Sequence, residues 1–199
     1  MKIGPLLKRA RTLRRWKQQA VADLAGVAQT TVSRWESGAV EPSAEQVRRL
    51  APVLSSVSDL ARDSGLRRLV VTSPLPVHLI CDLTHRLLAA SPAREAEWLV
   101  PASDLHGEPL FPFATDEIRE AESRLDGIGW FADATTGAVL WVRGRERATT
   151  IRMVAGYCIW ERLTLNDGSP VRLVTTLPPG ALPDGGLTRL FDGEPPVGR

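Results

Sequence analysis

The 199-residue sequence contains only two cysteines. Cys81 and Cys158 are too few for a disulfide framework, and their spacing does not match a zinc motif. No apolar stretch approaches the 18 residues that predict a membrane-spanning helix, and the apolar run after Met1 and Lys2 is too short for a signal peptide. We therefore expect a cytoplasmic protein with free thiols, no metal site and no membrane partner.

Signatures of catalysis are also missing. The sequence has no glycine-rich phosphate-binding loop and no histidine-kinase motif. His78, His85 and His106 have neither metal-ligand spacing nor a recognisable Ser/His/Asp arrangement. We expect His85 to be solvated in a turn. His78, near Cys81, leaves open a haem or metal ligand, although a partly buried histidine in a strand is the simpler interpretation. We predict that the protein is not an enzyme, with no catalytic residue and no required cofactor.

The charge is nearly balanced overall but unevenly distributed. The net charge is +2, and residues 1–50 hold 10 Lys or Arg against 4 Asp or Glu. That first quarter therefore carries +6, and residues 51–199 carry −4. Because the positive charge is concentrated in residues 1–50, we expect only this region to contact a polyanion. We expect this polyanion to be double-stranded DNA.

Two short helices joined by a turn are predicted over residues 18–38. Gly26 supplies the turn, because glycine adopts a positive φ without steric cost. The second helix begins at Ala28 and ends at Glu36. At 100° per residue, each helix has one apolar face that we expect to be buried. The residues predicted to face inward are Val21, Leu24, Ala28, Val32 and Trp35.

The outer face of the second helix carries side chains that form hydrogen bonds and bear no negative charge. Such a surface suits the floor of the DNA major groove. A plain helical hairpin with a solvated face is the alternative interpretation. We predict base contacts from Gln29, Thr30, Ser33 and Arg34. We predict phosphate contacts from Arg14, Lys17 and Gln18.

Several short motifs in this region occur together. They are Gln18-x-x-Val21-Ala22, Gly26-Val27, Val32-Ser33, Trp35-Glu36-Ser37-Gly38 and Pro42-Ser43. Together they resemble the phage-repressor/Cro type of helix-turn-helix, the Xre-like family, over roughly residues 3–55. The resemblance implies a transcription regulator that places its second helix in the major groove. Two positions depart from the family pattern: Ala28 replaces the usual Ser or Thr cap, and Ser37 replaces a frequent Asn.

Residues 1–56 are expected to form an all-α helix-turn-helix domain of four or five helices. The proline at position 52 is expected to kink the last helix or to start a new one. The predicted core of this domain consists of Leu6, Leu13, Trp16, Val21, Leu24, Val32, Trp35, Val47 and Leu50. We expect residues 57–76 to connect it to the next domain through a short helix interrupted by Gly65.

From Val77 the apolar period changes from that of helices to that of strands. We expect a hairpin first, then short helices and a clear helix over residues 114–125 capped by Thr115. Three more strands follow, one of them from about Thr150 to Leu165, and the last two join at Asn166-Asp167-Gly168. We predict an α+β domain over 77–178 with a five-stranded antiparallel sheet, and a mobile Pro/Gly-rich tail over 179–199.

Part of this second domain matches a known sensor pattern. The matching residues are His78-Leu79-Ile80-Cys81-Asp82, residues 86–93, Asp104-Leu105-His106-Gly107 and Pro109-Leu110-Phe111. They resemble a PAS-like sensor domain, which implies the strand order 2-1-5-4-3 around a cavity or a solid core. Another small α+β barrel-like ligand domain is the alternative. In that order Cys81 and Cys158 lie about 9–10 Å apart, beyond disulfide reach.

Four of the six tryptophans lie in the second domain. Core packing is their ordinary role, and an aromatic pocket for a small apolar or flat ligand is the alternative. The candidate pocket residues are Trp98, Trp130, Trp141 and Trp160.

We predict a sequence-specific DNA-binding transcription regulator whose second domain dimerises it and senses a small-molecule effector. Leu66, Leu69 and Val70 of the connector are candidates for the homodimer contact. The alternative function is an antitoxin-like interaction module that binds another protein and autoregulates through the same helix-turn-helix.

Overall fold

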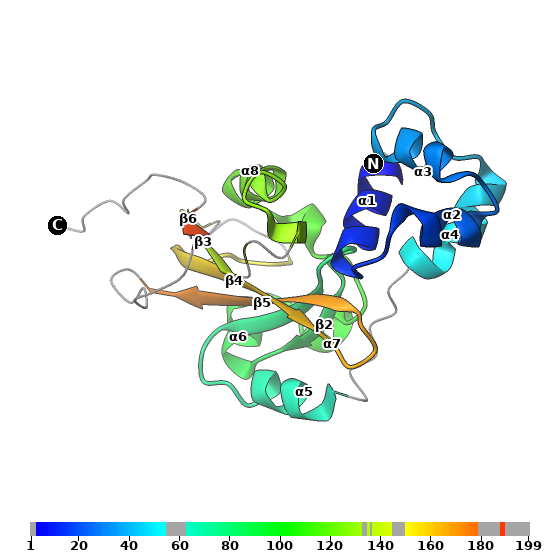
Figure 1. Cartoon of the computed structure of the whole chain (residues 1–199). Helices are drawn as coiled ribbons and strands as arrows, with labels where there is room; N and C mark the ends of the chain where they lie inside the picture. The colour runs from blue at the N-terminus through cyan, green and yellow to red at the C-terminus, as the bar shows by residue number, and fades with distance from the viewer. Residues whose placement is uncertain are drawn as a thin grey trace.

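The computed structural model describes residues 3–54, 63–132, 135, 137–144, 150–178 and 188–189. Four helices from the N-terminal quarter lie together beside the sheet that the rest of the chain forms (Figure 1). Residues 55–62, which include the end of the expected first domain and the start of the expected connector, lie outside the described residues. So does the expected tail, apart from residues 188–189.

The N-terminal helices enclose a small apolar core. They are α1 (Ile3–Leu13), α2 (Gln18–Ala25), α3 (Gln29–Glu36) and α4 (Ala44–Leu54). As expected, this core includes Val21, Val32, Trp35 and Leu50, each at most 1% exposed. The core extends beyond these helices, because Cys81 and Leu83 belong to the same buried cluster.

Three residues expected in this core lie on its surface. Trp16 and Leu24 are 38% and 39% exposed, and Ala28 is also exposed. Trp16 follows Arg15, whose φ of 55° turns the chain away from the axis of α1. Ala28 has extended backbone and precedes α3 as its N-cap, so it does not share the inner face of that helix. Helical periodicity therefore does not apply to Trp16 or Ala28.

Helix α4 continues through position 52 to Leu54, so the expectation that a new helix begins there is wrong. Proline removes one backbone hydrogen bond from a helix. Leu50 and Val53 are both fully buried on the inner side of the same segment. Their packing stabilises the last turn against the loss of that bond.

One six-stranded sheet, ordered β2-β1-β5-β4-β3-β6, forms the centre of the second unit. Its strands are β1 (Val77–Cys81), β2 (Leu87–Ala90), β3 (Gly137–Val142), β4 (Gly156–Thr164), β5 (Pro170–Leu177) and β6 (Thr188–Arg189). The expected order of the first five strands is confirmed. The expected five-stranded antiparallel sheet is wrong, because β6 pairs with β3 in parallel. Strand β3 would otherwise be an edge with unpaired backbone groups.

The remaining elements surround this sheet. They are α5 (Ser64–Val71), α6 (Pro92–Glu97), α7 (Ala102–Leu105), η2 (Phe111–Phe113), α8 (Asp116–Arg124) and η3 (Trp130–Ala132). Thr115 caps α8 as expected, because its hydroxyl accepts a hydrogen bond from the backbone N–H of Ile118 at 3.4 Å. Gly65 lies in the first turn of α5 and does not interrupt it. None of the described helices is long and apolar enough to cross a membrane.

Candidate functional sites

The outer face of α3 is a polar surface with no acidic side chain exposed on it. Gln29, Thr30, Ser33 and Arg34 are all exposed, while Val32 and Trp35 are buried on the opposite side. The turn before the helix depends on Gly26, whose φ is 69° and whose N–H caps α2. The structure thus brings the four candidate base contacts together, and their role in DNA binding stays a prediction.

A buried carboxylate holds this face in place. Glu36 accepts hydrogen bonds from Nε of Arg11 at 2.6 Å and from Nε2 of Gln18 at 2.8 Å. The Gln18 amide oxygen in turn accepts a hydrogen bond from Gln29. This chain of contacts fixes the start of α2 relative to α3. The sequence placed Arg11 among the basic residues expected near DNA phosphates. It did not indicate this ion pair, because the partner lies 25 residues away.

The three candidate phosphate contacts differ in their surroundings. Lys17 is exposed at the start of α2, and Gln18 is half-buried. Arg14 is half-buried and donates a hydrogen bond to the backbone oxygen of Val53 at 2.5 Å. Burial lowers the pKa of Arg14, while Cys81 and Asp167 raise it. The guanidinium of Arg14 thus braces the end of α4 in addition to any contact with DNA.

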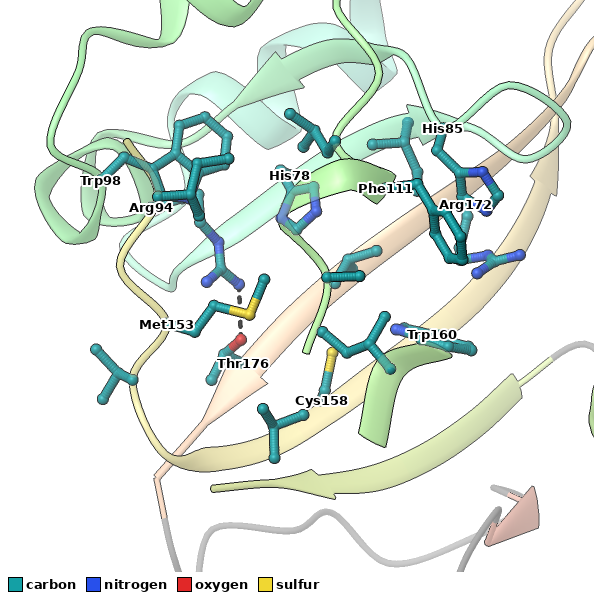
Figure 2. A pocket seen from close by; sticks show the side chains of 18 of the residues that line it. His78, His85, Arg94, Trp98, Phe111, Met153, Cys158, Trp160, Arg172 and Thr176 are labelled. Atoms are coloured by element: carbon teal, nitrogen blue, oxygen red, sulfur yellow. Dashed lines mark hydrogen bonds between the residues drawn. The ribbon is translucent and has the colours of Figure 1, made fainter. Parts of the chain in front are cut away.

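A cavity of about 100 Å³ lies between the sheet and the helices that follow β2. Its lining is mostly aromatic and aliphatic, with His78 projecting among the other side chains (Figure 2). Trp98 and Trp160 line it, as the pocket hypothesis requires. The other two candidate tryptophans do not. They are Trp130, which is fully buried, and Trp141, whose ring packs edge-on against Tyr157 at 5.1 Å.

A buried network of charges contributes Arg172 and Glu122 to the lining of the cavity. Arg172 on β5 donates to Asp82 from Nε at 2.6 Å and to Glu122 from Nη1 at 2.7 Å. Its guanidinium also lies 4.6 Å from the ring centre of Trp160. Burial alone would lower the pKa of Arg172, but the two carboxylates outweigh it and raise that pKa. The arginine is therefore a permanent cation.

His85 belongs to this network, so the expectation that it is solvated is wrong. Its side chain is only 14% exposed, and its Nε2 lies 3.3 Å from Oε1 of Glu122. The ring stacks on Phe111 at 4.9 Å. A left-handed backbone conformation, with φ of 56°, lets the turn direct this ring inward. Burial would raise the pKa of Glu122, but Arg172 and His85 lower it well below its ordinary value.

The same carboxyl group reaches the N-terminal helices. Nη1 of Arg9 on α1 lies 3.4 Å from Oε1 of Glu122, and Nη2 donates to the backbone oxygen of Glu122 at 3.3 Å. The Arg9 guanidinium also stacks over Phe131 at 4.2 Å. Glu122 lines the cavity as well. It therefore contacts both the cavity wall and α1, the helix that precedes the helix-turn-helix.

The other polar part of the cavity lies around Arg94. This side chain donates to the backbone oxygen of Pro76 at 2.6 Å and to Thr176 at 2.7 Å (Figure 2). It also pairs with Glu97 at 2.6 Å. Burial, and then the neighbouring Arg94, lower the pKa of His78 well below its usual value. An arginine beside His78 is an unfavourable neighbour for a metal cation, and the described residues hold no cluster of metal-ligating side chains.

Both cysteines are buried, and neither forms a disulfide. Strand β5 separates the strands that carry them, which agrees with the expected spacing. Cys158 lines the cavity, and burial raises the pKa of its thiol. This environment does not favour a reactive thiolate.

Comparison with known proteins gives one family-model match and matches among solved structures. No curated protein matches the sequence. Among solved structures, the chain is similar to the PAS domain of an HTR-like protein from Haloarcula marismortui, at 16% identity and a TM-score of 0.41, over 58% of this chain and 95% of that one. It is also similar to an RNA-binding light-oxygen-voltage receptor, at 11% identity and a TM-score of 0.40, over 89% of this chain and 58% of that one. The helix-turn-helix family model matches residues 7–58, so this part of the chain is a helix-turn-helix region.

Proposed function

We propose that the protein is a sequence-specific transcription regulator of the Xre-like, phage-repressor/Cro type, which acts in the cytoplasm and catalyses no reaction. The observation that carries this proposal is the outer face of α3. Its exposed amide, hydroxyl and guanidinium groups follow a glycine turn, and they match the donor and acceptor pattern of the major groove. The helix-turn-helix family match over residues 7–58 supports the same function.

The second domain is proposed to be a PAS-like sensor. The strand order β2-β1-β5-β4-β3 agrees with the order that the sequence resemblance implies. A partly apolar cavity beside the sheet provides a place for a small-molecule effector. Glu122 is the proposed link to DNA binding, because one carboxylate contacts Arg172 in the cavity wall and Arg9 on α1.

We further propose that the protein binds DNA as a homodimer. A single helix-turn-helix contacts one half-site, and such proteins typically pair across half-sites about 34–36 Å apart. Of the three apolar connector residues considered for this contact, Val70 is 2% exposed and Leu66 packs against the sheet unit. Leu69 is 66% exposed, so it is the one that remains available to a second copy.

The base-reading role is tested by selecting binding sites from random double-stranded DNA with the full-length protein. Arg34→Ala should then weaken binding to the selected site by about 1–3 kcal/mol and relax specificity at one base pair. Arg48→Ala is the matched control, because Arg48 is exposed on α4 and pairs with Glu45. Titrations at one salt concentration should show an unchanged affinity for this control. An equal loss of affinity for selected and random DNA in Arg34→Ala would contradict base reading.

A further inference from the structure

Four residues that line the cavity each have a buried nitrogen without a hydrogen-bond partner in the described part of the chain. Two of these atoms, on His85 and Arg172, lie beside the carboxylates of Glu122 and Asp82. The other two, Nδ1 of His78 and Nε of Arg94, have no such neighbour among the described ion pairs. The other two nitrogens of the Arg94 guanidinium are engaged, one with Glu97 and one with Pro76 and Thr176. Buried polar groups are almost always paired, because an unpaired one loses its hydration without compensation. These atoms therefore indicate where a polar group of a ligand binds.

The size and lining of the cavity restrict the rest of the ligand. About 100 Å³ is less than the roughly 150 Å³ of an apolar cavity that binds benzene, so the buried part of a ligand contains at most one aromatic ring. The walls of the cavity include the aromatic rings of Trp98, Phe111 and Trp160. Aromatic walls favour a flat ring through stacked or edge-on contacts.

The electrostatics of the cavity favour a ligand without net charge. The cation of Arg94 is paired with Glu97, and that of Arg172 is paired with Glu122 and Asp82. His78 is neutral near pH 7, because burial and Arg94 lower its pKa. A charged ligand would therefore lose its hydration without gaining a buried counter-ion.

Arg152 also lines the cavity, but unlike Arg94 and Arg172 it is exposed to solvent. Solvent screens an ion pair at such a position, and the pair contributes little. We therefore expect the buried atoms, rather than Arg152, to select the ligand.

We propose that the cavity binds an uncharged molecule with a single aromatic ring and one carbonyl or hydroxyl oxygen, which accepts a hydrogen bond from Nε of Arg94 beside Nδ1 of His78. This proposal rests on the sensing role proposed above and specifies its ligand. Nε of Arg94 is a donor only, so the ligand must supply an acceptor there. A primary aromatic amide supplies both an acceptor for this N–H and a donor for an imidazole nitrogen.

Three probes of similar size separate the parts of this proposal. Benzamide has the ring and a neutral oxygen, benzoate has the same shape with a charge, and toluene has no hydrogen-bonding group. Each is titrated into the full-length protein by calorimetry, with the melting temperature measured in parallel. Benzamide should bind one to one and about tenfold or more tighter than either other probe.

His78→Leu should weaken benzamide binding about tenfold and leave toluene binding unchanged or stronger. His106→Gln is the matched control, because His106 is exposed and outside the cavity lining, and it should bind benzamide like the wild type. If circular dichroism shows that His78→Leu does not fold, the relative affinities of the three probes for the wild type decide whether the proposal holds.

Several results would overturn the proposal. They are benzoate binding as tightly as benzamide, toluene binding as tightly as benzamide, unchanged benzamide binding in folded His78→Leu, or no binding of any probe. Binding to selected DNA is measured on the same preparation. If the protein binds the selected DNA but the probes do not bind as expected, only the proposed ligand class is rejected. If the protein does not bind DNA, the regulator function is rejected, and the relative affinities of the three probes still test the proposed ligand class.

Discussion

Replacing Glu122 with glutamine should destabilise the protein strongly, although the two side chains have nearly the same shape. Glu122 is 6% exposed and pairs with Arg172 at 2.7 Å, His85 at 3.3 Å and Arg9 at 3.4 Å. Removing one member of a buried ion pair typically costs about 3–5 kcal/mol. Arg172 keeps Asp82 as a partner, and glutamine keeps one acceptor oxygen. We therefore expect a loss at the lower end, about 3 kcal/mol.

Urea unfolding, followed by tryptophan fluorescence, measures this loss. In a chain of this size, about 3 kcal/mol lowers the melting temperature by roughly 6–12 °C. Glu120→Gln is the matched control on the same helix. Glu120 pairs with Arg124 at the surface, where both side chains are about half exposed, and such pairs contribute about 0–1 kcal/mol. Equal stability of the two variants would refute the reasoning.

The effect of Glu122→Gln should also depend on pH, with a defined sign. The pKa of Glu122 in the folded protein lies well below its ordinary value of 4.5, mainly because of Arg172. The unfolded state therefore binds this proton first as the pH falls, and the stabilisation by Glu122 is complete above about pH 4.5. It should decrease progressively at lower pH. A difference between wild type and variant that grows as the pH falls below that value would contradict the assigned environment.

Two further predictions use matched pairs of variants. Gly4→Ala should destabilise by about 1–3 kcal/mol through overpacking, because an added Cβ would lie 1.8 Å from the backbone oxygen of Trp35. Gly65→Ala in α5 should instead leave the free energy of unfolding unchanged or raise it by up to about 1 kcal/mol, because that Cβ would meet open space. Equal effects of the two substitutions in urea unfolding would contradict both predictions. Leu69→Glu should shift a homodimer towards monomer in analytical ultracentrifugation, whereas Leu99→Glu, at a 53% exposed position, should not. A monomeric wild type, or an unchanged dimer in Leu69→Glu, would reject α5 as the contact.

The helix-turn-helix was predictable because its determinants are local. A glycine at the turn and an apolar face repeated every three to four residues lie within one short stretch. The pairing of β4 with β5 was predictable for a related reason, since the turn around Gly168, with φ of 80°, joins neighbouring strands. The full strand order, in which β1 lies beside β5, followed from the PAS-like resemblance and not from turn residues. In the N-terminal domain, Trp16 and Ala28 were placed wrongly because they lie beyond helix ends, where periodicity no longer applies. Leu24 was also placed wrongly: it lies in the last turn of α2 and is 39% exposed.

The charged network was not predictable, because its members are far apart in the sequence. Arg172 is 90 residues from Asp82 and 50 from Glu122, and Arg9 is 113 residues from Glu122. No periodicity relates such positions, and each residue alone has the pattern of a solvated charge. Strand β6 was missed for a similar reason, because its partner β3 is distant and its own two residues have no strand pattern.

The location of this network argues for a role beyond stability. Burying an ion cluster costs several kcal/mol per ion in lost hydration, and well-packed apolar residues of similar volume often stabilise a fold as much or more. Stability alone therefore gives no reason for charges at this position. The cluster lies where the cavity and α1 meet, and both Arg9 and His85 approach the same oxygen of Glu122. A change in the cavity that moves this carboxylate must alter its contact with α1, which an apolar cluster could not transmit as directly.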